Sequence, residues 1–159
     1  MTRKKIVLIL LWSCILTQAQ TVFAQLKMVQ FEQIDSLQKI EKRNIVVFIH
    51  TDWCKYCKTM QNTTFKNTEL ITLLNNKFYF VDFDAEDKRK IVFNEKVFDF
   101  KPNGSKTGVH ELALQLGTID KQISYPSLCI LNDKYEIIFQ FNSFMNAKDL
   151  MAVLTTLEK

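Results

Sequence analysis

Two cysteines separated by two residues, Cys54 and Cys57, follow closely on a run of five apolar residues, Ile45 to Ile49. The run is short and rich in β-branched side chains, which predicts a buried strand, and a helix is expected to follow the first cysteine. The N-terminus of a helix presents unpaired N–H groups and a partial positive charge, which favour the thiolate form of a cysteine. A dithiol at such a strand-to-helix junction can open and close as a disulfide, so this spacing predicts a redox-active cysteine pair.

Residues 1–24 have the pattern of a signal peptide. It consists of a basic start, a short apolar region and a small-residue cleavage site: Arg3-Lys4-Lys5, Ile6 to Leu16, and Val22-Phe23-Ala24 before Gln25. The apolar region is too short to span a membrane comfortably. We therefore expect residues 25–159 to form one secreted domain. Two alternatives, a retained membrane anchor and a lipoprotein modified at Cys14, are less favoured.

The charge of the chain argues against a nucleic-acid partner. The formal net charge is +4, but three of the positive charges lie in residues 1–24, which hold no acidic residue, so residues 25–159 carry only +1. A nearly balanced protein lacks the basic surface that nucleic acid requires. Three cysteines remain after residue 24, which is too few for a disulfide scaffold, and the third, Cys129, is expected to be a buried core residue.

Hydrophobic periodicity predicts an α/β domain. Helices are expected at 31–40, 55–62, 68–75 and 109–116 and after a cap at Asn146, and strands at 45–49, 78–84, 127–131 and 135–141. Strand, helix and strand follow one another between residues 45 and 84, which predicts a parallel βαβ unit.

Several finer expectations follow from single residues. In the helix at 31–40, Phe31, Ile34, Leu37 and Ile40 recur at helical spacing, and Gly117 is expected to stop the helix at 109–116 as its C′ residue. Residues 91–94 and 96–100 are predicted to pair as a hairpin around Asn94-Glu95, with a loop at 102–105.

The element order and two motifs resemble the thioredoxin fold, a mixed central sheet flanked by helices. The motifs are Trp53-Cys54-x-x-Cys57-Lys58 and the later Tyr125-Pro126-Ser127. The resemblance covers nearly all of residues 31–159, with 86–108 looking like an insertion before the strand that follows the cis-proline. The stretch from Asp52 to Lys58, followed by Thr64-Phe65, is most similar to secreted thioredoxin-like proteins and to the C-terminal domain of the bacterial transmembrane thiol–disulfide interchange protein.

The resemblance assigns roles to these residues. It implies that Cys54 is the nucleophile and Cys57 the more buried resolving thiol, and that Trp53 packs beside them. Pro126 corresponds to the cis-proline that faces the dithiol, where the backbone of the preceding residue, Tyr125, pairs with a bound substrate peptide.

One departure concerns proton transfer. Many thioredoxins carry a buried carboxylate six residues before the first cysteine, as proton acceptor for the resolving thiol, and here that position is Phe48. His50 and Asp52, nearer to Cys54, are the candidates to replace it electrostatically, and water is the alternative. Lys55 and Tyr56 are expected to be exposed, where they either tune the redox poise and contact partners or are merely tolerated.

Other interpretations of the cysteines are weaker. A zinc site needs four good ligands, and only His50 and His110, which is expected on the surface, could join the cysteines. Three alternatives remain for the protein. They are an inert structural disulfide, a peptide-binding module in which the cysteines matter little, and an oxidase or isomerase that uses the same residues. The favoured interpretation is a secreted, periplasmic disulfide reductase with no cofactor or metal, acting on protein dithiols and disulfides and recharged by a membrane electron donor.

Overall fold

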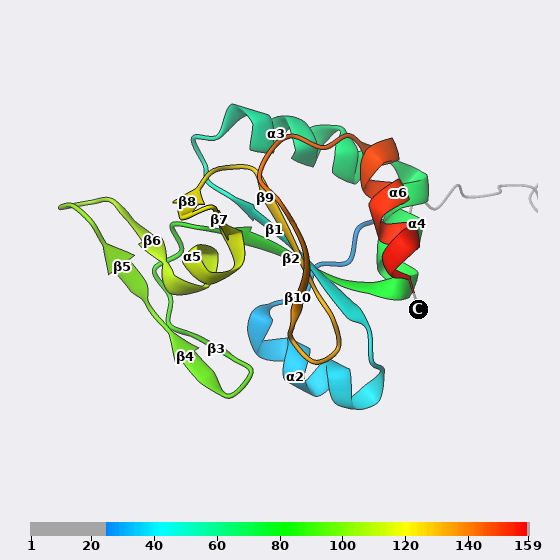
Figure 1. Ribbon diagram of the computed structural model, residues 1–159, viewed down its shortest axis with the longest axis horizontal. Helices are drawn as coiled ribbons and strands as arrows, with labels where there is room; N and C mark the ends of the chain where they lie inside the picture. Colours follow the sequence, from blue (N-terminus) through cyan, green and yellow to red (C-terminus); the bar gives the residue numbers. More distant parts are fainter. Residues whose placement is uncertain (1–24, 159) are drawn as a thin grey trace, which may run out of the picture.

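The computed structural model describes residues 25–158, so the predicted signal peptide lies outside the described part of the chain. A four-stranded sheet in the order β10-β9-β1-β2 forms the centre (Figure 1). Its strands are β1 (Asn44–His50), β2 (Phe78–Asp84), β9 (Ser127–Leu131) and β10 (Ile137–Phe141). β1 pairs parallel with β2 and antiparallel with β9, which pairs antiparallel with β10. The predicted mixed sheet and parallel βαβ unit are confirmed.

In the part of the chain that the structure describes, five α-helices cover the two faces of the sheet. The first face carries α3 (Lys55–Asn62), α4 (Thr68–Lys77) and α6 (Ala147–Leu157), and the second carries α2 (Phe31–Ile40) and α5 (Glu111–Gly117). Consecutive side chains of a strand point to opposite faces. In β1, Val46 and Phe48 therefore join the first core, whereas Val47 and Ile49 join the second.

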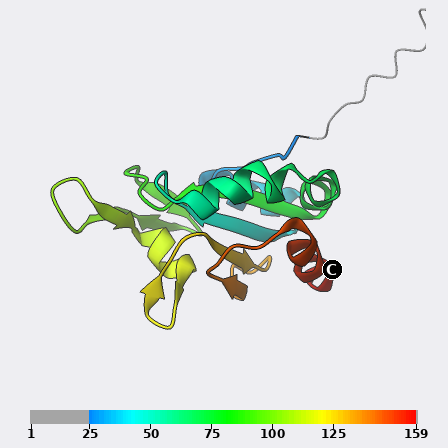
Figure 2. The ribbon, with the colours of Figure 1, turned by 90° about the horizontal axis from the view of Figure 1, so that it is seen from above.

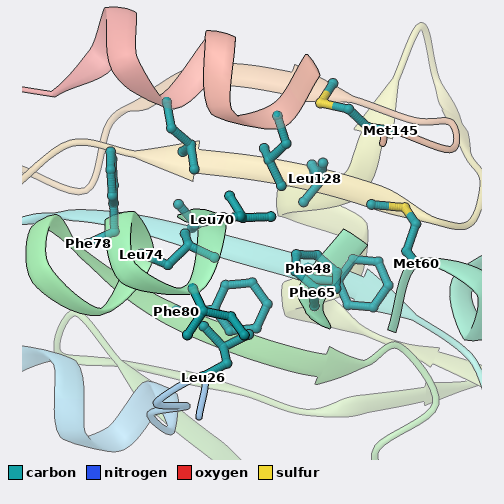
Figure 3. Close-up of a cluster of buried hydrophobic side chains, with 14 of the residues drawn as sticks. Leu26, Phe48, Met60, Phe65, Leu70, Leu74, Phe78, Phe80, Leu128 and Met145 are labelled. Atoms are coloured by element: carbon teal, nitrogen blue, oxygen red, sulfur yellow. The ribbon is translucent and has the colours of Figure 1, made fainter. Parts of the chain in front are cut away.

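Aromatic side chains fill the first core beneath α3 and α4. Phe48 packs edge-on against Phe65 at 4.8 Å between ring centroids, and Phe65 packs against Phe80 at 5.0 Å (Figure 3). Phe65 belongs to a short 3-10 helix, η2 (Thr64–Lys66), between α3 and α4. This packing holds η2, which directly follows α3, against the sheet. Cys54 caps the start of α3, and Cys57 lies in its first turn.

The segment between β2 and α5 forms two small hairpins. The first pairs β3 (Ile91–Phe93) with β4 (Lys96–Phe98), and its turn residues Asn94 and Glu95 have φ of 50° and 62°. It confirms the predicted hairpin, although Phe100 lies outside it. The second, not predicted, pairs β5 (Phe100–Pro102) with β6 (Gly108–His110) and extends beyond the sheet (Figure 2). A third hairpin, of β7 (Thr118–Ile119) and β8 (Gln122–Ile123), leads to β9.

The helix predicted at 109–116 begins later and ends differently. Val109 and His110 belong to β6, and α5 runs from Glu111 to Gly117. Gly117 is its last residue and not a C′ stop, because no glycine of the described chain has a positive φ. Close packing explains this glycine better, since an added Cβ would lie 3.2 Å from Cδ1 of Ile49.

The helix predicted at 31–40 is confirmed, but its last apolar residue, Ile40, does not join the core, because its side chain is 83% exposed. The inward position near the end of α2 belongs to Gln38, which is buried. Its amide nitrogen donates to the carbonyl of Arg43 at 2.7 Å, and its amide oxygen accepts from the Arg43 N–H at 3.0 Å. The buried glutamine thus satisfies the backbone where the chain turns from α2 into β1.

Candidate active site at the Cys54–Cys57 disulfide

Cys54 and Cys57 are joined by a disulfide at the start of α3, with their Cα atoms 5.3 Å apart. Cys54 is the N-cap residue of the helix, and its Sγ accepts a hydrogen bond from the backbone N–H of Cys57 at 3.1 Å. When the disulfide opens, a thiolate at Cys54 would sit on this N–H and on the positive end of the helix dipole. Cys54 is 5% exposed and Cys57 is fully buried, so an incoming group can reach only the first sulfur.

The side chains around the two cysteines are exposed. Lys55 and Tyr56, between the cysteines, are exposed as predicted, and Asp52 is exposed as well. Trp53 is also exposed over 65% of its surface, directly before Cys54. The dithiol therefore lies at the surface under a rim of large side chains, and those side chains meet any protein that approaches Cys54.

Trp53 is fixed by residues from two other segments. Its indole Nε1 donates to Oε1 of Glu86 at 3.2 Å, and its ring meets the ring of Tyr125 edge-on at 5.9 Å between centroids. The peptide bond between Tyr125 and Pro126 is cis, as the resemblance implies. Burial, together with the carboxylates of Glu86 and Asp84, raises the pKa of Tyr125 to about 12, so its hydroxyl stays protonated.

His50 ends β1 on the face that carries α3. Its ring stacks on Phe48 at 5.5 Å, and its Nε2 lies 3.0 Å from Oδ1 of Asp82. Burial alone would lower the pKa of His50, but the hydrogen bond and charge of Asp82, with the charges of Asp84 and Asp52, outweigh it and raise the pKa. The position that carries a carboxylate in many thioredoxins is the buried Phe48, and Asp82 lies opposite it on β2.

Three carboxylates of the site, Asp82, Asp84 and Glu86, were missed by the sequence interpretation. Asp82 and Asp84 alternate at the end of β2, and the register places Asp84 beside His50. The signal was available, because parallel strands bring their carboxyl ends to one edge of a sheet, and the cysteines follow the end of β1. Glu86 carried no local signal, since its role depends on a contact with Trp53 across the chain.

Cys129 is buried in β9, as predicted, and burial raises the pKa of its thiol to about 12. Its side chain packs in the core on the second face of the sheet, whereas Cys54 and Cys57 belong to the first. The sheet therefore separates this thiol from the disulfide.

The prediction that His110 lies on the surface is wrong, because the residue is fully buried. Its Nδ1 accepts the backbone N–H of Leu112 at 3.2 Å, which caps α5, and its Nε2 lies 3.0 Å from the carbonyl of Arg89. With Nδ1 accepting, Nε2 carries the proton and donates to that carbonyl. His110 thus ties the start of α5 to the segment that leaves β2.

Within residues 25–158, no three His, Cys, Asp or Glu side chains are grouped so as to hold a metal ion. No helix in that part of the chain is long and apolar enough to cross a membrane.

Comparison with known proteins gives one family and several solved structures. The family described as a thioredoxin-like domain matches residues 30–158. No curated protein sequence matches the chain. Among solved structures, the DsbH oxidoreductase is similar with a TM-score of 0.59 and 18% identity over 89% of this chain and 92% of its own.

Two further structures have comparable coverage. A thioredoxin from Thermus thermophilus is similar with a TM-score of 0.60 and 16% identity over 84% of this chain and 87% of its own. The C-terminal domain of DsbD from Neisseria meningitidis, in its reduced form, matches with a TM-score of 0.49 and 15% identity over 77% of this chain and 89% of its own. At identities this low, the likeness to the DsbH oxidoreductase and to the Thermus thermophilus thioredoxin shows the shared fold and nothing finer.

Proposed function

The chain belongs to the thioredoxin-like domain family and is a thiol–disulfide oxidoreductase, and from this premise we propose that it reduces disulfides of other proteins outside the cytoplasm. The observation that carries the proposal is the unequal exposure of the two sulfurs at the start of α3. Cys54 is 5% exposed and directly follows the exposed Trp53, whereas Cys57 is fully buried.

The proposed reaction proceeds in two exchanges. The Cys54 thiolate attacks one sulfur of a substrate disulfide, forms a mixed disulfide and releases the other substrate sulfur as a thiolate. Cys57 then loses its proton and attacks the Cys54 sulfur, which releases the second substrate thiolate and closes the Cys54–Cys57 disulfide. Two electrons pass to the substrate, and a membrane electron donor is proposed to return the protein to its dithiol form.

The direction of the reaction is supported by the charges around the dithiol. The carboxylates of Asp52, Asp84 and Glu86 lie at the same end of the sheet as Cys54. Negative charge disfavours a thiolate, which makes the reduced form less stable and the dithiol a better electron donor. The helix N-terminus and Lys55 act in the opposite sense. We propose that the carboxylates prevail and that the potential is low.

The extracytoplasmic location rests on the sequence of residues 1–24. The basic start, the short apolar region and the small residues before Gln25 are the pattern that directs a protein across the inner membrane. The test is fractionation of cells that express the full chain, with N-terminal sequencing of the product. A product that begins near Gln25 in the periplasmic fraction supports the proposal, and an uncleaved product in the cytoplasm refutes it.

The reductase assignment is tested by the reduction potential of the Cys54–Cys57 pair, measured in glutathione and dithiothreitol buffers with an alkylation readout. We expect a value near the thioredoxin end of the family range, about −270 mV. A reduction potential of about −120 mV would point instead to disulfide formation or isomerisation. A pair that cannot be cycled would leave only a peptide-binding role, which the double variant Cys54→Ser/Cys57→Ser would retain.

A further inference from the structure

Positive charge is concentrated in one segment of this nearly balanced chain. Residues 88–108 hold six cationic and two acidic side chains, a net charge of +4, whereas the other residues after the predicted signal peptide sum to −3. All six cationic residues are exposed. The segment between β2 and α5 is thus basic, and the body of the domain is acidic.

The outer hairpin of this segment carries no carboxylate at all. We refer to residues 100–110, which form β5, β6 and the loop between them, as the arm; its charged residues are Lys101 and Lys106. Lys88 joins them, because its ammonium lies 5.8 Å from the centroid of the Phe100 ring. Lys101 pairs with Glu111 at 2.8 Å, but Lys88 and Lys106 make no ion pair with any described residue.

The arm is anchored beside the dithiol. The backbone N–H of Ala85 donates to the carbonyl of His50 at 2.8 Å, and the N–H of His110 donates to the carbonyl of Ala85 at 2.8 Å. Glu86 holds the indole of Trp53, which precedes Cys54. Both ends of the basic segment are therefore attached at the edge of the sheet where the cysteines lie, and the arm extends outward from there (Figure 2).

We propose that the arm, with Lys88, is a recognition surface for the proteins whose disulfides this enzyme reduces, and that those proteins carry carboxylates near the reactive disulfide. The inference rests on the proposed function, because it takes the substrate to be a protein disulfide. Cationic side chains without partners attract an acidic surface over a distance of roughly 10 Å, speed its approach and fix its orientation. The carboxylates at the dithiol itself lie inward of the arm, so the attraction applies to the flank of the substrate and not to its sulfur atoms.

The geometry sets the design of a peptide probe. An extended peptide advances about 3.3 Å per residue, so acidic residues roughly six positions from the cysteine lie about 20 Å from the sulfur. The strands of the arm are only a few residues long, so glutamates at this distance from the sulfur are placed to meet the arm. Two peptide disulfides of equal length serve as substrates, one with four glutamates in these flanks and one with four lysines. A neutral small disulfide, hydroxyethyl disulfide, reports the dithiol chemistry alone.

The experiment measures second-order reduction rates of these three disulfides by the dithiothreitol-reduced full chain, at low and at high salt. We expect the glutamate peptide to react on the order of tenfold faster than the lysine peptide at low salt, and the preference to fade at high salt. The double variant Lys88→Glu/Lys106→Glu should lose or invert the preference while its rate with hydroxyethyl disulfide stays unchanged. The matched control is Lys39→Glu/Lys148→Glu, two exposed lysines on α2 and α6, which should keep the preference.

Each other result has a definite meaning. A wild-type protein that reduces all three disulfides without regard to charge overturns the inference and leaves the proposed function standing. A preference that survives reversal of Lys88 and Lys106 also overturns it and assigns the attraction to other lysines, such as Lys55 on α3. Failure of the reduced protein to react even with hydroxyethyl disulfide counts against the proposed function itself.

Discussion

Nε2 of His50 lies 3.0 Å from Oδ1 of Asp82, and this contact joins the ends of the two parallel strands behind the redox helix. Both side chains are largely shielded from solvent, with exposures of 13% and 22%. The imidazole also stacks on Phe48, which fills the position of the usual thioredoxin carboxylate. The contact thus places an ionisable pair next to the position where that carboxylate is missing.

The first prediction concerns the pH dependence of this pair. The pKa of His50 is raised above 6.5 in the folded state, mainly by Asp82 acting against burial. Folding therefore favours the protonated imidazole, and the resulting stability is fully present below pH 6.5 and is lost as the pH rises through the folded pKa. Asp82→Asn should lower the free energy of unfolding at pH 5.5 by about 1.5–3 kcal/mol, and by much less at pH 9.

Urea unfolding of the oxidised protein at the two pH values measures this difference. Asp133→Asn is the matched control, since Asp133 pairs with the exposed Lys42 at 3.5 Å and should change stability little at either pH. An Asp82→Asn effect of the same size at pH 5.5 and pH 9 would contradict the assignment of the charged pair.

The second prediction separates the two cysteines. Cys57→Ser should accumulate a mixed disulfide between Cys54 and a peptide disulfide, because the resolving thiol is gone. Cys54→Ser should form almost none, because Cys57 is fully buried. Cys129→Ala should cycle like the wild type, since the Cys129 thiol is buried on the other face of the sheet and its pKa is raised to about 12. Intact-protein mass spectrometry after acid quenching counts the adducts, and comparable adducts on both single variants would refute the order of attack.

The third prediction concerns the contact between Glu86 and Trp53. Glu86→Ala removes the acceptor of the indole hydrogen bond, so the Trp53 side chain should move more freely. Glu86→Gln keeps an oxygen acceptor and should hold the indole nearly as well. Both variants remove one negative charge near the dithiol, so both should raise the reduction potential, on the order of 10 mV if a surface charge contributes roughly 0.5 kcal/mol.

Fluorescence anisotropy of Trp53, in a Trp12→Phe background that leaves one indole in the chain, measures the mobility. The potential is measured in parallel by the alkylation assay. We expect the anisotropy of Trp53 to fall only in Glu86→Ala, whereas the reduction potential should rise in both variants. Identical anisotropy in all three proteins would show that Tyr125 alone holds the ring.

Local sequence determined the parts of the fold that carry strong hydrophobic patterns. Strands β1 and β2 and helix α3 were predictable because short apolar runs and the cysteine spacing specify them without reference to distant residues. Hairpin β5–β6 was not, since its side chains are mostly exposed and polar and contain no alternating pattern. The helical spacing of Ile40 did not reveal its exposure, because spacing alone cannot show that Gln38 closes the turn with Arg43.

The candidate site divides in the same way. Cys54, Cys57, Trp53 and Pro126 belong to motifs that can be found in a single segment each. Asp82, Asp84 and Glu86 reach the site through strand register and through a hydrogen bond between segments that are 33 residues apart in the sequence. Tertiary pairing, and not local propensity, brings these carboxylates to the dithiol, which is why the redox direction was harder to predict than the redox chemistry.

The last prediction concerns His110, which ties the start of α5 to the basic segment. His110→Ala leaves the N–H of Leu112 and the carbonyl of Arg89 without partners in a buried site, and should lower the free energy of unfolding by about 2–4 kcal/mol. His110→Asn can restore the cap but cannot reach both groups, and should recover about 1 kcal/mol.

Hydrogen exchange gives a second readout of the same variants. The backbone amides of residues 85 and 110 hold the segment to β1, and their exchange should accelerate in the alanine variant at a pH where the fold is intact. Urea unfolding and exchange mass spectrometry measure the two effects. An alanine variant as stable as the asparagine variant would show that the buried imidazole only fills space.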